Sequence, residues 1–183
     1  MKNIRQPLRQ KRRAIKPLSR ERFAKQLFEK TMQMAKFQTT QKIALYLEND
    51  GEISPKYIQN FLKNAGFSVY LPVLDDKKLK FAQLSAELKK NKFGINEPVS
   101  AKILPTEQLD IIFIPLVGFD QNKNRIGMGG GFYDRTLAFK KQQKNSTPKL
   151  YGLAFDCQKV DKLEAQKWDV PLDAVITPTT IYR

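Results

Sequence analysis

A glycine-rich stretch is the part of this chain best suited to chemistry. Residues 125–135 read Arg-Ile-Gly-Met-Gly-Gly-Gly-Phe-Tyr-Asp-Arg. Glycine lets backbone N–H groups converge on an anion in conformations that other residues resist. Arg125 and Arg135 add fixed positive charge on either side, and Asp134 could hold Mg²⁺ against a phosphate. The stretch therefore predicts a phosphate-binding loop.

The glycine cluster alone leaves a second interpretation open, a flexible turn followed by a helix-capping aspartate. It is not a Walker loop, because no Gly-Lys-Ser or Gly-Lys-Thr follows it. It also differs from the dinucleotide fingerprint, because it lies late in the chain and lacks the βαβ spacing. Other parts of the sequence must decide between anion binding and a simple turn.

The residue types that are missing exclude several mechanisms. The 183 residues contain no histidine, which is the commonest general base and metal ligand. Ser-His-Asp hydrolases and the usual zinc sites are therefore excluded, and a metal would need oxygen ligands, which favours Mg²⁺. The one cysteine, Cys157, cannot form an internal disulfide, which indicates a reducing compartment.

Positive charge is concentrated at the N-terminus. The formal net charge is +15, which attracts anions of any kind, including nucleic acids, anionic membranes, nucleotides and polycarboxylates. Arg5, Arg9, Arg12 and Lys16 are spaced so that they would share one face of a helix. Charge alone does not choose among the anions, but its position predicts an anion-binding N-terminal helix.

Alternating apolar segments must position these residues. Strands are expected at residues 43–47, 68–74, 80–84, 110–116, 150–155 and 174–176. Helices are expected at 5–16 (ended by Pro17), 19–35 (capped by Ser19), 54–66 and 132–144. This alternation predicts an α/β sheet with parallel pairs. Ligands bind at the carboxyl ends of such strands, where the glycine-rich stretch would lie.

Several blocks of the sequence, in order, resemble the 5-formyltetrahydrofolate cyclo-ligases, also called methenyltetrahydrofolate synthetases. The glycine stretch has the form Gly-x-Gly-x-Gly-Phe-Tyr-Asp-Arg and follows Ile-Pro-x-x-Gly-Phe-Asp at residues 114–120. The other similar blocks are residues 5–9, 47–52, 93–98, 168–173 and 176–178. The resemblance covers nearly the whole chain.

The resemblance implies a reaction that uses ATP as co-substrate and Mg²⁺ as cofactor. The formyl oxygen of 5-formyltetrahydrofolate is phosphorylated, the 10-amine attacks the activated carbon, and phosphate leaves. The products are 5,10-methenyltetrahydrofolate, ADP and phosphate. Such chemistry depends on positioning and charge neutralisation, and it requires no activated side chain because the substrate supplies the nucleophile.

The resemblance also implies site residues. Those expected to contact ATP are Arg5, Gln6, Pro7, Leu8, Arg9, Arg125, Ile126, Gly127, Met128, Gly129, Gly130, Gly131, Phe132 and Tyr133. Those expected to contact the folate are Arg9, Leu47, Glu52, Phe93, Met128, Gly129, Gly130, Gly131 and Phe132. The expected metal ligands are Asp134 and Asp173.

Some positions depart from the family's pattern or have a competing interpretation. Met128 and Gly130 are basic in some members, so phosphate contacts here must rest on backbone N–H groups, Arg125 and the N-terminal arginines. Phe93 is assigned equally to the core and to the ligand, Glu52 has the competing role of beginning a turn, and Asp173 that of capping one. Trp168 is interpreted as a packing residue.

We therefore expect one domain over residues 1–183, a three-layer α/β/α sandwich with a mostly parallel, Rossmann-like open sheet and a basic N-terminal helix. No apolar run approaches the roughly 18–20 residues that span a bilayer. The protein is expected to be a cytoplasmic monomer that binds small molecules, ATP and a folate that can be polyglutamylated, and neither nucleic acid nor membrane. Two alternatives stay open, a basic nucleic-acid-binding protein and an ATP-binding relative without cyclo-ligase activity.

Overall fold

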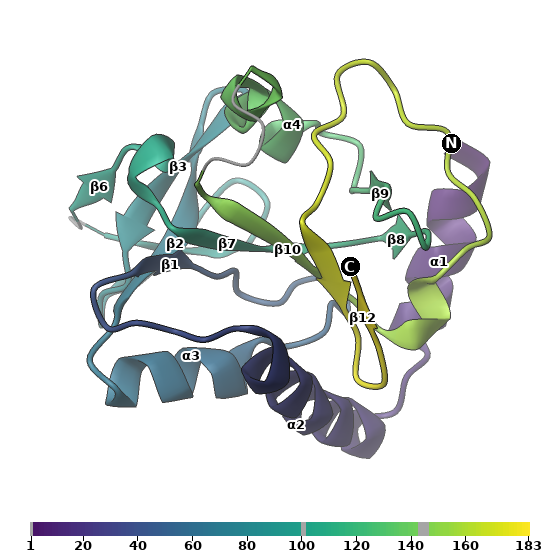
Figure 1. Ribbon diagram of the computed structural model, residues 1–183, viewed down its shortest axis with the longest axis horizontal. Coiled ribbons are helices and arrows are strands. Elements are labelled where there is room, and N and C mark those ends of the chain that lie inside the picture. Colours follow the sequence, from purple (N-terminus) through teal and green to yellow (C-terminus); the bar gives the residue numbers. More distant parts are fainter. Residues whose placement is uncertain (1, 100–101, 143–146) are drawn as a thin grey trace.

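The computed structural model describes residues 2–99, 102–142 and 147–183. Within them, an eight-stranded sheet in the order β12-β11-β10-β7-β1-β2-β3-β6 forms the centre of the molecule (Figure 1). Its strands are β1 (Lys42–Ala44), β2 (Ser68–Asp75), β3 (Lys78–Gln83), β6 (Ile103–Leu104), β7 (Ile111–Pro115), β10 (Lys149–Leu153), β11 (Ala174–Ile176) and β12 (Ile181–Tyr182). Two hairpins lie outside it, β4 (Leu88–Lys90) with β5 (Asn96–Pro98), and β8 (Gly118–Phe119) with β9 (Arg125–Ile126).

The central strands β2, β1, β7, β10 and β11 run parallel, whereas β12, β3 and β6 are antiparallel to their neighbours. From β1 the chain passes to β2 on one side of the sheet, and later builds β7, β10 and β11 on the other side. The direction of winding therefore reverses between β1 and β7. Open α/β sheets bind ligands at the carboxyl ends of the strands beside such a reversal.

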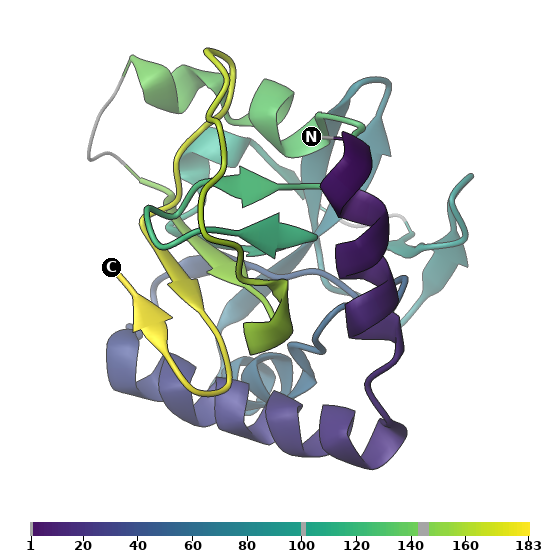
Figure 2. The same cartoon turned by 90° about the vertical axis from the view of Figure 1, so that its right-hand side faces the viewer.

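Helices and turns cover both sides of the sheet. The helices are α1 (Lys2–Arg13), α2 (Pro17–Met34), α3 (Lys56–Asn64) and α4 (Phe132–Thr136), with 3-10 turns η1 (Thr106–Gln108), η2 (Ala138–Lys141) and η3 (Asp156–Gln158). In Figure 1, α2 and α3 lie along one side of the sheet and α4 lies on the opposite side. Figure 2 shows α1 standing over the N-terminal end of α2, beside the β8–β9 hairpin. No helix of the described residues has the length and apolar character to cross a bilayer.

Strand β7 shows why the sheet is buried on both faces. Ile111 and Phe113 pack into a cluster with Leu27 of α2 and Ile58 of α3. Ile112 and Ile114 face the other way, into a second cluster that contains Leu137 and Leu150. Alternate side chains of a strand point to opposite faces, so an unbroken apolar run fills both cores. The expected α/β fold with a mostly parallel sheet is confirmed.

Three local predictions were wrong. The helix expected at 132–144 is only α4, Phe132–Thr136, because the next residue, Leu137, turns into the core and a 3-10 turn follows; residues 143–146 lie outside the described part. Helix α2 begins at Pro17, in the first turn, where a backbone N–H would have no partner within the helix and its absence from proline costs nothing. The N-cap is therefore Lys16 and not the expected Ser19. Of the strand expected at 43–47, only Ile43 and Ala44 belong to β1, which begins at Lys42.

Candidate active site

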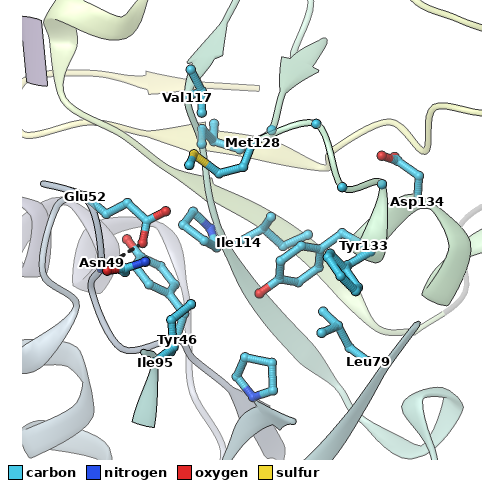
Figure 3. A pocket seen from close by; sticks show the side chains of 18 of the residues that line it. Tyr46, Asn49, Glu52, Leu79, Ile95, Ile114, Val117, Met128, Tyr133 and Asp134 are labelled. Carbon is cyan, nitrogen blue, oxygen red and sulfur yellow. Dashed lines mark hydrogen bonds between the residues drawn. The ribbon is translucent and has the colours of Figure 1, made fainter. Parts of the chain in front are cut away.

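A cavity of about 1060 Å³ opens beside the reversal point of the sheet (Figure 3). Its walls come from residues 46–52, which follow β1, from residues 114–117 at the end of β7, and from the glycine-rich residues 125–135. Drug-sized ligands occupy cavities of roughly 300–1,000 Å³, so this one lies at the upper end of that range.

The glycine-rich stretch forms a turn between β9 and α4 that requires its glycines. Gly129 and Gly131 have φ angles of 103° and 63°, a region that side chains disfavour. At Gly130, a Cβ atom would lie 2.6 Å from the ring of Phe132. The turn lines the cavity along its whole length.

Arg125 ties this turn to the C-terminal segment. Its side chain is 6% exposed, its Nη2 lies 2.5 Å from Oδ1 of Asp134, and its Nη1 donates to the carbonyl oxygen of Val170. The Val170 N–H also donates to Oδ1 of Asp134, at 3.3 Å. Within the described residues, Oδ2 of Asp134 accepts no hydrogen bond, so one carboxylate oxygen at the cavity remains available to a ligand.

A second carboxylate, Glu52, lies on the other side of the cavity from Asp134 (Figure 3). Its side chain is 11% exposed, its Oε2 accepts the N–H of Asn49 at 3.0 Å, and its Oε1 lies 3.8 Å from Nη1 of Arg12. Burial raises the pKa of Glu52 to about 7, although Arg12 and the Asn49 N–H oppose the shift. Glu52 is therefore a buried acceptor that gains from a ligand with N–H donors.

Aromatic rings form further parts of the wall. Tyr133 points into the cavity between Glu52 and Asp134 (Figure 3), and burial raises the pKa of its hydroxyl. Phe93 is 54% exposed and meets the ring of Phe132 edge-on at 6.1 Å between centroids. Trp168 is 64% exposed and lines the cavity, so its interpretation as a packing residue was wrong.

Helix α1 closes one side. Nε of Arg5 donates to the carbonyl oxygen of Gly127 at 3.0 Å, and Arg9 also lines the cavity. Arg12, on the same face, is completely buried and donates to the carbonyl oxygen of Leu116 at 2.9 Å. Arg5, Arg9 and Arg12 of the expected basic face are therefore turned inward, against the site, whereas Lys16 lies beyond the end of α1 and is exposed.

Comparisons with known proteins identify the family of this chain. The sequence model of the 5-formyltetrahydrofolate cyclo-ligase family matches residues 1–178. The chain belongs to this family. The cyclo-ligase of Escherichia coli strain K12 is 37% identical over 182 residues, which cover 96% of this chain and 98% of the relative. That of Haemophilus influenzae is 40% identical and covers 92% of each chain.

Solved structures of the family have the same fold. The 5,10-methenyltetrahydrofolate synthetase of Aquifex aeolicus superposes with a TM-score of 0.84 at 26% identity, covering 100% of this chain and 91% of the other. The synthetase of Mycoplasma pneumoniae gives a TM-score of 0.77 at 26% identity, covering 97% and 98%. The family and the enzyme class predicted from the sequence are confirmed.

The structure brings most of the expected cyclo-ligase site residues to one cavity. Those that line it are Arg5, Arg9, Leu47, Glu52, Phe93, Arg125, Ile126, Gly127, Met128, Gly129, Gly130, Gly131, Phe132, Tyr133 and Asp134. Gln6 and Pro7 are exposed outside it, and Leu8 is buried against Gly118. The helical period explains this difference, because residues 5 and 9 share a face and residues 6–8 lie around the rest of the helix.

Asp173 is not among the residues that line the cavity. Its Oδ2 accepts the N–H of Leu150 at 2.8 Å, and its Oδ1 lies 3.1 Å from Nζ of Lys149. These partners are at the start of β10, at the opposite end of the strand from the cavity. Asp134 and Asp173 are thus engaged in different parts of the structure. No group of three or more His, Cys, Asp or Glu side chains suited to a metal occurs in the described residues.

Sequence reasoning missed Asp50, Asp169 and the interior position of Arg12. Asp50 and Asp169 line the cavity, and Asp50 receives hydrogen bonds from three arginines of α1. The helical spacing of Arg12 with Arg5 and Arg9 was the signal that could have predicted its interior position. A charged helix face can be buried when a neighbouring acidic side chain pairs with it.

Proposed function

We propose that this protein converts 5-formyltetrahydrofolate to 5,10-methenyltetrahydrofolate with consumption of ATP and release of ADP and phosphate. The 5-formyl oxygen takes the γ-phosphoryl group of ATP. The 10-amine then attacks the activated carbon, and the carbon–oxygen bond to phosphate breaks. Membership of the cyclo-ligase family supports the reaction, and the geometry of the cavity supports its assignment to particular residues.

The observation that carries the proposal is that one cavity holds a glycine-built, arginine-flanked turn together with the buried acceptor Glu52. The turn and the arginines of α1 suit the phosphates of ATP, because backbone N–H groups and guanidinium groups neutralise charge from fixed positions. Glu52 suits the amino and ring N–H groups of the pterin. Such donors favour the ionised form of a carboxylate and would lower its raised pKa.

The residues of this chain act by binding and orienting both substrates. Arg5 and Arg9 hold phosphate oxygens from the side of α1, and Arg125, whose terminal nitrogens bond Val170 and Asp134, adds positive charge behind the glycine turn. Tyr133 and Phe93 supply apolar surface that excludes water. Phosphoryl transfer depends on positioning and charge neutralisation, so a site without histidine is sufficient.

The donor set at Asp134 suits Mg²⁺. This ion is usually held by one or two carboxylates, substrate phosphates and water at octahedral geometry, and Asp134 keeps one carboxylate oxygen available at the cavity. When bound with ATP, Mg²⁺ would neutralise charge on the phosphates. Asp173, which precedes β11 and bonds the start of β10, has no comparable access.

The inward-facing α1 argues against a nucleic-acid-binding function. Arg12 is buried, Arg5 is bonded to Gly127, and Arg9 is bonded to Asp50. Proteins that bind nucleic acids through charge present such side chains to solvent in a stripe or patch.

The direct test mixes the purified protein with Mg·ATP and 5-formyltetrahydrofolate and follows the near-ultraviolet absorbance of the methenyl product. ATP-dependent product formation is expected. A folded protein that binds ATP but forms no product would support the inactive ATP-binding relative instead. Steeply salt-dependent binding to DNA or RNA that ATP does not displace would support the nucleic-acid alternative.

A further inference from the structure

Three arginines of one helix converge on a single carboxylate beside the cavity. Asp50 lies in the turn after β1 with a φ of 51°, followed by Gly51 at 75°. This left-handed turn packs against α1 so closely that a Cβ atom on Gly51 would lie 3.2 Å from Cγ of Arg13. The backbone thus holds the carboxylate of Asp50 against the basic face of the helix.

The three arginines bond this carboxylate through different atoms. Nε of Arg9 donates to Oδ2 of Asp50 at 2.7 Å, and Nη2 of Arg12 donates to the same oxygen at 2.8 Å. Arg13 donates to Oδ1. Burial opposes ionisation, but the hydrogen bonds from Arg9, Arg13 and Arg12 outweigh it and hold the pKa of Asp50 well below its usual range. Asp50 is therefore ionised throughout the neutral range.

Only Arg9 of these three lines the cavity. Its Nε is occupied by Asp50, whereas its two terminal nitrogens donate to no acceptor in the described residues. One bond at Nε fixes the plane of a guanidinium and leaves the terminal N–H groups for a planar or tetrahedral anion. Arg12 is buried in the wall of the cavity. Its Nε donates to the backbone carbonyl oxygen of Asp50 at 3.0 Å and its Nη2 donates to Oδ2, so it holds Asp50 from the side away from the cavity.

An aspartate at a phosphate site is unfavourable by charge alone, because it repels the anion. The presence of Asp50 is explained if the ATP affinity gained by orienting an arginine exceeds the affinity lost through this repulsion. We infer that Asp50 is a positioning residue that fixes the guanidinium of Arg9 at the cavity wall for the phosphates of ATP. The inference rests on the proposed function, since it requires ATP in this cavity.

The inference predicts a change whose sign is opposite to the effect of charge. Replacing Asp50 by Asn removes one negative charge, and Coulomb attraction alone would then tighten ATP binding. Loss of orientation at Arg9 should instead weaken it. We expect Asp50→Asn to raise the Kd of Mg·ATP, measured by titration calorimetry, about tenfold, and to raise the KM for ATP with kcat changed less than about twofold.

A double-mutant cycle shows whether Asp50 acts through Arg9. If it does, Arg9→Ala combined with Asp50→Asn should weaken ATP binding no more than Arg9→Ala alone. Lys11→Ala is the control matched in charge, because Lys11 is exposed on the same helix and does not line the cavity. It should change the Kd less than about twofold.

Arg9→Lys keeps Asp50 and the positive charge, and so remains informative if Asp50→Asn does not fold. An ammonium group cannot bond Asp50 and present a planar pair of N–H groups together, so Arg9→Lys should weaken ATP binding nearly as much as Arg9→Ala. Wild-type affinity in Arg9→Lys, unchanged or tighter binding in Asp50→Asn, or additive effects in the cycle would overturn the inference while leaving the proposed function in place. A wild-type protein that does not bind ATP would overturn both.

Discussion

Aspartates lie next to the parallel strands both where the strands begin and where they end, but their carboxylates bond different partners. At the edge where strands begin, Asp110 precedes β7, donates its N–H to the carbonyl oxygen of Lys42 at 2.9 Å and accepts the Lys42 N–H at 2.7 Å. Asp173 precedes β11 and makes the same pair of bonds with Leu150, both at 2.8 Å. These two side chains extend the ladder between neighbouring parallel strands.

At the edge where strands end, the carboxylates of Asp50 and Asp134 are bonded to arginine side chains at the cavity. Glu52 is buried there with a raised pKa. Asp110 and Asp173 each accept an N–H from a neighbouring strand of the sheet, whereas Asp50 and Asp134 each accept a guanidinium N–H at the cavity wall. The bonding partners of these aspartates therefore distinguish those that extend the sheet from those at the proposed site, which their place in the sequence blocks does not.

The largest expected effect concerns the stability of the ligand-free protein. The pKa of Glu52 is about 7 in the folded chain against an ordinary 4.5. The folded chain therefore binds this proton more tightly, and the resulting stability is full below pH 4.5 and is lost as pH rises through 7. At 1.36 kcal/mol per pKa unit, the difference is about 3 kcal/mol. Urea unfolding at several pH values should show this loss in the wild type and not in Glu52→Gln; equal profiles would contradict it.

The next effect concerns magnesium. Asp134→Asn removes a charged oxygen ligand, so kcat/KM at limiting Mg²⁺ should fall about 100-fold and recover partly at high Mg²⁺. Asp173→Asn serves as the matched control, and its magnesium requirement should shift less than about twofold. The contrast between the two edges fails if both variants respond alike in a magnesium titration of product formation.

A smaller effect is expected on folate binding. Glu52→Gln replaces an acceptor of N–H donors by an amide, and the Kd of 5-formyltetrahydrofolate should rise about tenfold, as for loss of a hydrogen bond to a charged group. The Kd of ATP should stay within about twofold. Calorimetry with each ligand separately decides the point, and a selective loss of ATP affinity would reverse the assignment of Glu52.

The smallest effect is expected where the strands begin. Asp110→Asn and Asp173→Asn each weaken a side-chain hydrogen bond to a backbone N–H, and should lower the free energy of unfolding by about 1 kcal/mol. The KM values for both substrates should be unchanged. Urea unfolding and steady-state kinetics on the same preparations test this, and a variant that keeps full stability but loses activity would refute the structural role.

Much of the fold could be predicted because the residues within each segment indicate the structure of that segment. The unbroken apolar run of β7 was identified correctly as a buried strand, and the glycines at 127 and 129–131 were placed correctly in a loop that leads into a helix. Short strands such as β8 and β9 were not predicted, because two residues carry no readable period. The length of α4 also escaped prediction, since it is set by the burial of Leu137 in the core.

The site was predictable to the extent that helical spacing or a local motif revealed it. The spacing of Arg5 and Arg9 placed both on the cavity side of α1. The role of Asp50 depends on a left-handed turn and on a helix some forty residues earlier, a relation that no local pattern records. Asp173 resembled a ligand position in sequence, but only the pairing of β10 with β11 reveals its bonds to Leu150.

The contacts of α1 have a consequence for how the molecule assembles. Arg5 meets Gly127 across 122 residues of sequence, and Arg12 meets Leu116 across 104. During synthesis the helix leaves the ribosome long before these partners exist, and closing such long loops costs entropy that local contacts do not offset. These two contacts of the helix can therefore form only after Leu116 and Gly127 have been synthesised, and a chain truncated before them lacks the bonds that hold Arg5 and Arg12.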